Sequence, residues 1–394
     1  MGTPPARVLV KQDNTPHYFF APCPRGLAPV LAEELAALGA RDPAAVEAGV
    51  AFSGPYDLLY AANLHSRIAS RILWRVASGP YAKEDDVYQL AAGVKWSHHF
   101  NADRTIKVET NAHRSPLKSL DFITLRVKDA VVDQFRAAMG KRPSVETREP
   151  DVRIHVFLDA KVATLYVDTS GESLFKRGRR DHVGEAPLKK NLAAGILRLA
   201  GWKPGIALLD PMCGGGTFLS EAGEISLGWA PGRQRDFAFA KLSRYNEATW
   251  TRLLDGARAL ERAVEPLPLF GSDLYGRSLG NAAMNLREAG LADAVQLKQA
   301  NLLEISPPTT EGMIVTNPPY GVRLGEKEDL AEFYPRLGDA LKQRFAGWTA
   351  FIFSGDPELA KRIRLSPSRK PVLYNGALEC RLYEYRLVAG GNRR

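Results

Sequence analysis

The sequence predicts a protein in two parts, an α+β module followed by an α/β domain with a doubly wound parallel sheet. Its 394 residues are too many for one ordinary domain and suit two. The second half alternates short apolar strands with helical segments, whereas the first half mixes a few helices with paired strands. A Gly- and Arg-rich stretch separates the two patterns. We therefore expect a module over 1–170, a basic linker over 171–184 and an α/β domain over 185–394.

In the first half, apolar residues at three- and four-residue spacing predict amphipathic helices, and period-two alternation predicts strands. The predicted helices cover 27–38, 57–72 and 122–139, and the predicted strands cover 18–21, 105–110, 152–158 and 163–168. The last two strands are joined by Asp159-Ala160-Lys161, which predicts a hairpin.

The second half reads as a regular alternation of the two element types. Strands are predicted at 206–210, 267–273, 295–299, 313–317, 349–354 and 382–388, with helices at 216–224, 278–289, 329–345 and 357–363. An insertion at 228–266 contains a further helical segment with Trp250 on its apolar face, and we expect that face to pack into a core.

Composition excludes several classes of protein. With 45% hydrophobic and 25% charged residues the chain has a globular composition, and no apolar run approaches the roughly 18 residues of a membrane span. The start lacks the apolar core of a secretory signal, so we expect a cytoplasmic protein. Three scattered cysteines and seven scattered histidines offer no spacing for a disulfide framework or a metal site, and we expect neither.

The net charge of +9 is spread over both halves of the chain, and two local basic clusters stand out, at 176–180 and 361–370. Clustered Lys and Arg can replace counterions on nucleic-acid phosphates. A solvated basic face explains such clusters equally well. The first cluster supplies four candidate RNA contacts: Lys176, Arg177, Arg179 and Arg180.

Ligands of a doubly wound sheet bind beyond the carboxyl ends of its strands, and the strand at 206–210 ends in an unusual turn. Three successive glycines, 214–216, allow the backbone a sharp turn and a close approach to a ligand. The turn matches neither GxGxxG nor a Walker loop, and Asp210 would repel a pyrophosphate but suit a cationic ligand. A tight strand–helix connection without any ligand is the alternative reading.

Two further strand ends carry polar groups. Asp273 can accept both hydroxyl hydrogens of a ribose, although a helix cap is an equally ordinary role for it. Asn317-Pro318-Pro319-Tyr320 offers an amide carbonyl, a rigid backbone and a flat ring. That combination suits a planar base with an exocyclic amine, and a simple proline-rich turn is the alternative.

Together these three strand ends resemble the class I methyltransferases that use S-adenosylmethionine. The Asn-Pro-Pro-Tyr box is typical of members that methylate exocyclic amino groups of bases. CPRG at 23–26 and the segment 168–195 are similar to the bacterial THUMP-containing guanine-N2 methyltransferases, and most similar to those acting on 23S rRNA. The resemblance covers 18–388.

The resemblance implies a Rossmann-like domain with a mostly parallel seven-stranded sheet, preceded by a ferredoxin-like and THUMP module that docks RNA. It implies S-adenosylmethionine as cofactor and 23S rRNA, or the assembling large ribosomal subunit, as partner. The implied cofactor-binding residues are Asp210, Pro211, Cys213, Gly214, Gly216, Asp273 and Asn301. The implied catalytic residues are Asn317, Pro318, Pro319 and Tyr320, which would hold the N2 group of a flipped guanine and stack on its ring.

The chain departs from the family pattern in two places. Asn301 stands where many relatives have an aspartate, but its carbonyl can still accept a hydrogen bond from an adenine amine. Some relatives are fused to a second methyltransferase, and this chain ends after one sheet, so we expect only the first activity. Three alternatives remain open: a tRNA guanine-N2 methyltransferase, an adenine-N6 DNA methyltransferase, and a non-catalytic RNA-binding or assembly factor.

Overall fold

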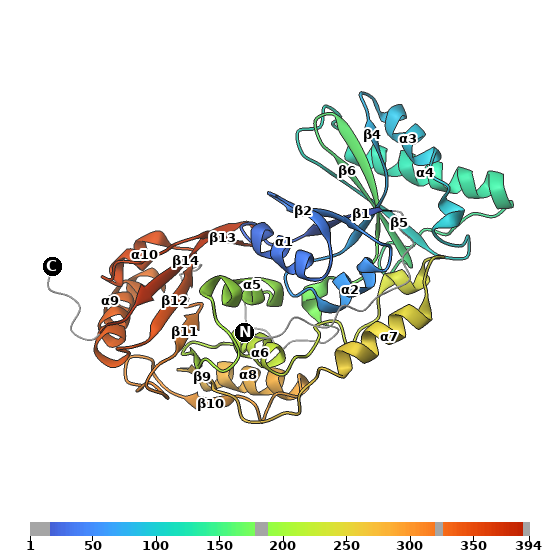
Figure 1. The fold of residues 1–394 in the computed structure, drawn as a ribbon. Helices are drawn as coiled ribbons and strands as arrows, with labels where there is room; N and C mark the ends of the chain where they lie inside the picture. Colours follow the sequence, from blue (N-terminus) through green and yellow to red (C-terminus); the bar gives the residue numbers. More distant parts are fainter. Residues whose placement is uncertain (1–15, 178–187, 320–325, 389–394) are drawn as a thin grey trace.

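The computed structural model describes residues 16–177, 188–319 and 326–388, which form two seven-stranded sheets with helices packed on them (Figure 1). The first sheet contains β1–β7 and the second contains β8–β14. The α+β module and the α/β domain that the sequence predicts correspond to these two sheets.

The elements of the first part run in the order expected for an α+β fold. They are β1 (His17–Pro22), α1 (Ala28–Ala37), β2 (Arg41–Val46), β3 (Gly49–Gly54), α2 (Leu58–His65), β4 (Leu73–Pro80), α3 (Glu84–Ala92), η1 (Trp96–His98), β5 (Ile106–Ala112), α4 (Leu120–Met139), β6 (Val152–Leu158), β7 (Val162–Asp168) and η2 (Leu174–Lys176).

The strand order of the first sheet is β2-β3-β1-β4-β7-β6-β5, with only β5 and β6 parallel among these neighbours. The predicted hairpin is confirmed, since β6 and β7 pair antiparallel around Asp159, which accepts the backbone N–H groups of Lys161 and Val162. The long helix α4 begins where the Ser119 hydroxyl accepts the Phe122 N–H, and it ends at Gly140 in a left-handed conformation.

The helix predicted over 57–72 is too long, because α2 ends at His65. The Glu34 carboxylate accepts the Ser66 hydroxyl and the backbone N–H groups of Arg67 and Ile68, and these bonds hold the following segment in an irregular path. An apolar period alone does not reveal this, because the competing acceptor comes from another helix.

The second part alternates strands and helices as the sequence predicts. Its elements are α5 (Lys190–Ala200), β8 (Leu208–Asp210), α6 (Thr217–Ser226), η3 (Ala238–Lys241), α7 (Glu247–Arg258), β9 (Leu269–Asp273), α8 (Gly276–Glu288), β10 (Gln296–Gln299), β11 (Met313–Thr316), α9 (Glu326–Arg344), β12 (Thr349–Ser354), α10 (Pro357–Arg362), β13 (Val372–Asn375) and β14 (Leu378–Arg386).

The strand order of the second sheet is β10-β9-β8-β11-β12-β14-β13. The first five strands are parallel, and β14 runs antiparallel between β12 and β13. The mostly parallel seven-stranded sheet is therefore confirmed. The carboxyl ends of β8, β9, β10 and β11 share one edge, and the sheet order reverses direction at β8, which is where an open α/β sheet binds its ligand.

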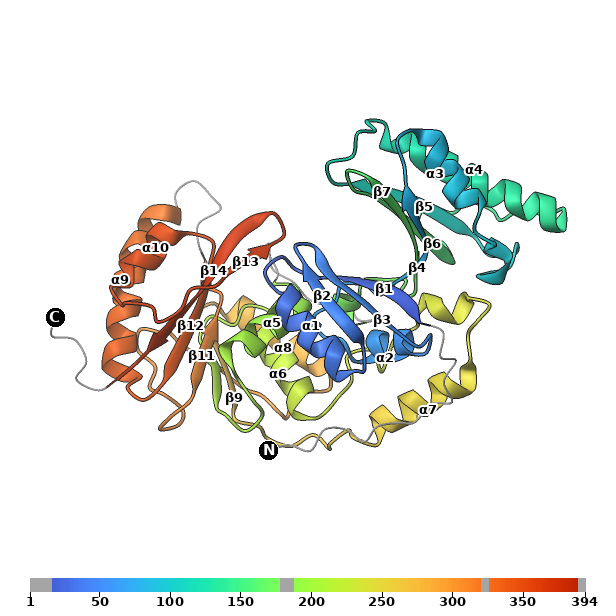
Figure 2. The ribbon, with the colours of Figure 1, turned by 45° about the horizontal axis from the view of Figure 1, so that its top comes forward.

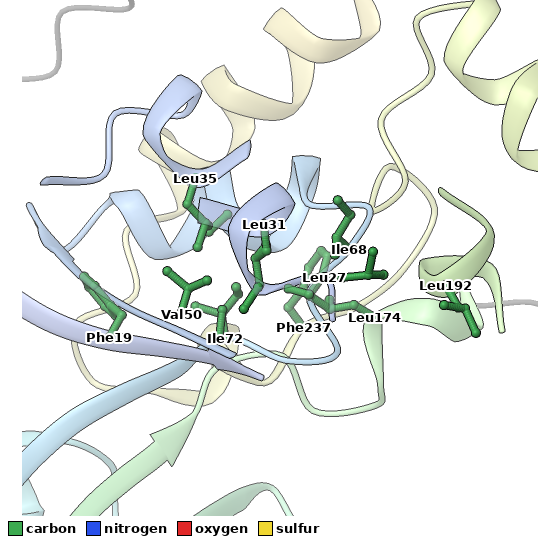
Figure 3. Packing of buried hydrophobic residues seen from close by; sticks show 14 of the residues in the cluster. Phe19, Leu27, Leu31, Leu35, Val50, Ile68, Ile72, Leu174, Leu192 and Phe237 are labelled. Carbon is green, nitrogen blue, oxygen red and sulfur yellow. The ribbon is translucent and has the colours of Figure 1, made fainter. Parts of the chain in front are cut away.

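The two parts share a continuous apolar core (Figure 3). Leu27 and Leu31 of the first part lie in one cluster with Leu192 of α5 and Phe237 of the insertion. A Cβ on Gly195 would lie only 2.3 Å from Leu27 Cδ1, so α5 needs a glycine there to approach α1. Figure 2 shows α7 reaching across toward α2, and Trp250 packs against Tyr60, as expected for its apolar face.

In the described part of the chain, none of the helices combines the length and the apolar character that a membrane span requires.

Candidate active site

The glycine turn connects β8 to α6 at the shared strand edge. Gly214 and Gly216 have φ values of 52° and 75°, a region that side chains other than glycine rarely adopt. A Cβ on Gly216 would lie 3.3 Å from the Ala282 Cβ of α8. The Cys213 N–H donates to the Ser272 carbonyl at 2.9 Å, and the Asn285 amide of α8 donates to the Gly215 carbonyl at 2.9 Å. The turn is thus fixed by two neighbouring elements.

Asp210, the last residue of β8, is buried at the start of this turn. The Thr316 hydroxyl at the end of β11 donates to Asp210 Oδ1 at 2.8 Å. Burial raises the pKa of Asp210 to about 7; the nearby Asp273 adds to the shift, and the Thr316 hydrogen bond opposes it. Near neutral pH this carboxyl can therefore gain or lose its proton in response to a bound charge.

Asp273 ends β9 directly beside the turn and is 8% exposed. Its Oδ2 accepts the Gly214 N–H at 3.0 Å, and its Oδ1 accepts the Tyr275 N–H at 3.0 Å. A carboxylate has about four acceptor positions, so these two bonds leave capacity for further donors. Asp273 thus both orients the glycine turn and offers free acceptor positions at the strand edge.

Asn301 lies in the loop that follows β10, where a cavity of about 850 Å³ opens between that loop and β9 and β10. Its Oδ1 accepts the Leu303 N–H at 3.1 Å, and its amide donates to Glu304 at 3.2 Å. These local bonds orient the side chain and leave its carbonyl one acceptor position. The cavity is lined by Asn301 but not by the glycine turn.

The Asn-Pro-Pro segment follows β11, directly after Thr316. The side-chain carbonyl oxygen of Asn317 is buried and has no hydrogen-bond partner among residues 16–177, 188–319 and 326–388. Pro318 is buried, and the Pro319 carbonyl accepts the Tyr334 hydroxyl of α9 at 3.2 Å. Tyr320 lies outside the described residues. The segment therefore presents an unpaired acceptor directly after Thr316, the residue that contacts Asp210.

Sequence reasoning missed three supporting residues of this site: Thr316, Asn285 and Tyr334. Each acts across the fold, through Asp210, the Gly215 carbonyl and the Pro319 carbonyl respectively. The positions of Asn285 and Tyr334 in predicted helices gave no sign of these contacts. Within the described residues, His, Cys, Asp and Glu side chains form no group suited to a metal ion.

The basic cluster at 176–180 differs from the expectation. Arg177 is 1% exposed, and its guanidinium donates hydrogen bonds to Glu221 of α6. The prediction that Arg177 contacts RNA is therefore wrong, because its charge is paired with a carboxylate in the protein interior. Lys176 is exposed and pairs with Glu172 at 2.6 Å. Arg179 and Arg180 lie outside the described residues.

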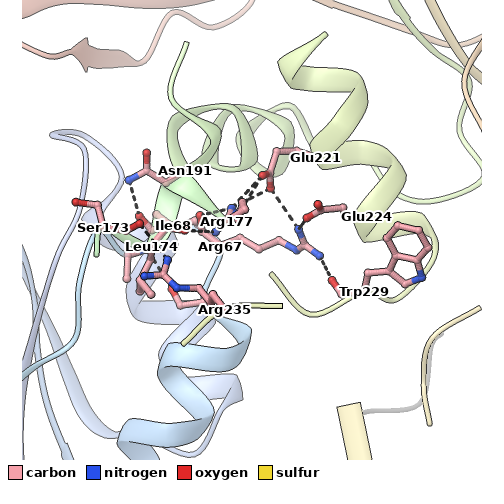
Figure 4. Close-up of polar contacts among 12 residues, drawn as sticks. Arg67, Ile68, Ser173, Leu174, Arg177, Asn191, Glu221, Glu224, Trp229 and Arg235 are labelled. Atoms are coloured by element: carbon pink, nitrogen blue, oxygen red, sulfur yellow. Dashed lines mark hydrogen bonds and ion pairs between the residues drawn. The ribbon is translucent and has the colours of Figure 1, made fainter. Parts of the chain in front are cut away.

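Arg177 belongs to a buried polar network between the two parts (Figure 4). Its Nε and Nη2 donate to Glu221, and Arg67, from the segment after α2, contacts both Glu221 and Glu224 of α6. Arg67 also donates to the Trp229 carbonyl, and Arg177 donates to the Leu174 carbonyl at 3.0 Å. Because α6 begins at the glycine turn, this network ties the first part to the helix that supports the site.

Comparison with known protein families assigns domains to both parts of the chain. Residues 177–384 match the family model described as RMKL-like, methyltransferase domain. Residues 81–168 match the THUMP domain, and residues 18–73 match the RlmL ferredoxin-like domain.

Relatives match nearly the whole chain. The Synechocystis protein slr0064, whose name places it among RNA methyltransferases, is 40% identical over 94% of this chain and 96% of its own. The ribosomal RNA large subunit methyltransferase K/L of Syntrophotalea carbinolica is 42% identical over 94% of this chain but only 54% of its own, so the chain spans about half of that relative. The solved structure of SMU.472 in complex with SAH superimposes with a TM-score of 0.86, at 30% identity, over 98% of this chain and 100% of that one. The chain therefore belongs to the family of RMKL-like methyltransferases, with a ferredoxin-like and a THUMP domain ahead of its methyltransferase domain.

Proposed function

We propose that this protein transfers a methyl group from S-adenosylmethionine to the N2 atom of a guanosine in 23S rRNA. The observation that carries the proposal is the Asn317 carbonyl, buried and without a partner in the described structure. A buried acceptor left unpaired costs roughly 1–3 kcal/mol, so its retention at a strand edge suits a site that pairs it with a substrate N–H.

The residues present fit S-adenosylmethionine. The left-handed glycine turn admits close approach of a ligand to its backbone, and Asp273 retains acceptor capacity for ribose hydroxyls. Asp210 offers a negative charge toward a cationic ligand, and Asn301 offers a carbonyl toward an adenine amine. The cofactor supplies a methyl group activated by its attachment to a sulfonium.

The protein's own contribution is positioning. The Asn317 side-chain carbonyl and the Pro318 backbone carbonyl would accept hydrogen bonds from the two N–H groups of guanine N2. The lone pair of that nitrogen is otherwise conjugated into the ring. Held in this way, the nitrogen is directed at the methyl group, and fixed geometry supplies much of the rate. Tyr334 keeps the segment in place through the Pro319 carbonyl, and Tyr320 would stack on the base.

The choice of rRNA rests on similarity to relatives named for the large ribosomal subunit and on the THUMP domain. Such a substrate implies action in the cytoplasm, on free 23S rRNA or on the assembling subunit.

Methyl transfer from labelled S-adenosylmethionine to purified 23S rRNA, tRNA and DNA tests the proposal. We expect label in 23S rRNA, recovered as N2-methylguanosine; label confined to tRNA or DNA would replace the substrate, and no transfer to any would favour a non-catalytic factor.

Replacing Asp273 with Ala should weaken S-adenosylmethionine binding about tenfold to a hundredfold, because hydrogen bonds to a charged group contribute about 1.5–3 kcal/mol. Calorimetric titration measures the affinity, and circular dichroism checks the fold. Asp273→Asn serves as the control, since it keeps one acceptor oxygen and should lose less. Unchanged affinity in a folded Ala variant would leave Asp273 as a support for the glycine turn alone.

Binding of S-adenosylmethionine should strengthen as the pH rises toward 7. The raised pKa of Asp210 means that the free protein holds a proton there below about pH 7, whereas a cationic ligand favours the carboxylate. Binding should therefore release a proton, and affinity should rise by up to about tenfold per pH unit between about pH 5.5 and 7. Calorimetry in two buffers of different ionisation enthalpy counts the released protons. Asp210→Asn should abolish the dependence; a dependence that persists would assign it to another group.

A further inference from the structure

The first sheet has one face without helices. The helices α1, α3 and α4 pack on the opposite face, where residues such as Phe19, Val50 and Val156 are buried. Side chains alternate along a strand, so the intervening residues point the other way. Figures 1 and 2 show α3 and α4 side by side next to β4 and β5, and α1 next to β2 and β3. Within the described residues, none of these three helices covers the second face, although Asp168 and Leu73 at its one end are buried.

Aromatic and cationic side chains gather on this second face, and the strand registers bring them together. We call the group the platform: Tyr18 and Phe20 of β1, Arg75 of β4, Tyr166 of β7, and Arg153 and Phe157 of β6. Tyr18 is 48% and Phe157 38% exposed, which is unusual for large rings on a sheet.

The platform contains one cation–π contact and one aromatic pair. The Arg75 guanidinium lies 4.1 Å from the centre of the Tyr18 ring, and Phe20 and Tyr166 lie 6.1 Å apart. A β1–β4–β7–β6 run spans about 14 Å at the usual strand spacing of about 4.8 Å. In RNA-binding modules, exposed rings on four neighbouring strands can stack two or three bases of single-stranded RNA.

The β1 end of the platform lies near the edge of the second sheet that carries the candidate active site. Arg25, three residues after the end of β1, lies 4.1 Å from the ring centre of Tyr374 near the end of β13. Since β13 is antiparallel to β14, and β14 to β12, it runs in the same direction as β11 and β12. Tyr374 therefore lies at the same edge as Asn317.

We propose that the platform binds a single-stranded stretch of the substrate RNA beside the methylated guanosine. The inference rests on the function proposed above, and it names the binding surface and the form of RNA that it takes. A flipped target is least costly where its neighbours are unpaired, so single-stranded flanks are expected. Arg75 and Arg153 complement phosphates, while the exposed rings stack on bases irrespective of sequence.

The test compares two matched pairs of substitutions. The double variant Tyr18→Ser with Arg75→Ala removes a cation–π pair from the platform. The control, Tyr88→Ser with Arg126→Ala, removes a pair with the same 4.1 Å separation from α3 and α4 on the opposite face. Fluorescence anisotropy with a labelled single strand of about 12 nucleotides, and with the matching duplex, gives the affinities of both variants and of the wild type.

We expect the platform variant to bind the single strand roughly five- to a hundredfold more weakly, with a salt dependence flatter by about 0.7. The control should stay within about twofold of the wild type, and S-adenosylmethionine affinity should be unchanged in both. Equal single-strand affinity in the platform variant would refute the platform and leave the proposed function standing. A wild type that binds S-adenosylmethionine but no RNA would refute both. A wild-type dimer that becomes monomeric in the platform variant, measured by sedimentation, would assign the face to self-association instead.

Discussion

Asn317→Ala should lower the rate of methyl transfer about 100- to 1,000-fold while leaving the affinity for S-adenosylmethionine nearly unchanged. The substitution removes the buried acceptor at the end of β11 without touching the glycine turn or Asp273. The loss of one preorganised hydrogen-bonding group in an active site has effects of this size on kcat. Single-turnover assays with saturating RNA measure the rate, and calorimetry measures cofactor binding.

Two further variants test whether the effect comes from the Asn317 acceptor itself. Asn317→Asp keeps an acceptor oxygen in the same place, so it should retain more activity than the Ala variant. Thr316→Val removes the hydroxyl that donates to Asp210 and should affect cofactor binding more than the chemical step. A wild-type rate for Asn317→Ala on intact RNA would contradict the assignment of Asn317 to the base.

Glu221→Ala should destabilise the protein by about 3–5 kcal/mol, because it leaves the buried Arg177 without its carboxylate partner and Arg67 with Glu224 alone. Glu221 is fully buried, and Arg177 approaches both of its oxygens at 3.0 and 3.1 Å. Removing one partner of a buried ion pair leaves an uncompensated charge, which costs more than the pair itself contributes. Urea unfolding followed by circular dichroism measures the change in the free energy of unfolding.

The surface pair of Lys361 and Glu358 provides the control. Its groups lie 2.6 Å apart, as close as a good ion pair, but both side chains are more than 70% exposed. Glu358→Ala should therefore cost about 0–1 kcal/mol. The double variant Arg177→Met with Glu221→Leu should recover part of the loss, since it leaves one fewer unpaired buried charge. A Glu221→Ala variant as stable as Glu358→Ala would contradict the role of the network.

The sequence predicts the parts of the fold whose signals are local. Strands β8, β9, β11 and β12 are short apolar runs, and each ends in a polar residue or a glycine turn, which also marks the site edge. β2 escaped prediction because it is exposed along its length and contains Pro43, so it shows neither alternation nor an apolar run. The β13 strand was also missed, because it has only four residues and directly follows Arg369, Lys370 and Pro371.

In the candidate site, too, the sequence locates the residues that belong to local motifs but not the contacts between distant residues. Asp210, Asp273 and Asn317 could be located because each lies at or just after the carboxyl end of a strand, within a recognisable motif. The Thr316–Asp210 bond joins residues 106 positions apart, and the Arg177–Glu221 pair joins residues 44 apart. A charge cluster such as 176–180 gives the sign of its residues but not their partners, and this is why Arg177 was assigned to RNA when it lies inside the protein.

Nucleoside mapping of 23S rRNA by mass spectrometry tests the central claim most directly. The rRNA comes from cells lacking this protein, complemented either with the wild type or with Asn317→Ala. We predict that N2-methylguanosine at one site is lost without the protein, restored by the wild type and not restored by the variant. An identical set of modified nucleosides in cells with and without the protein would contradict the claim that 23S rRNA is its substrate.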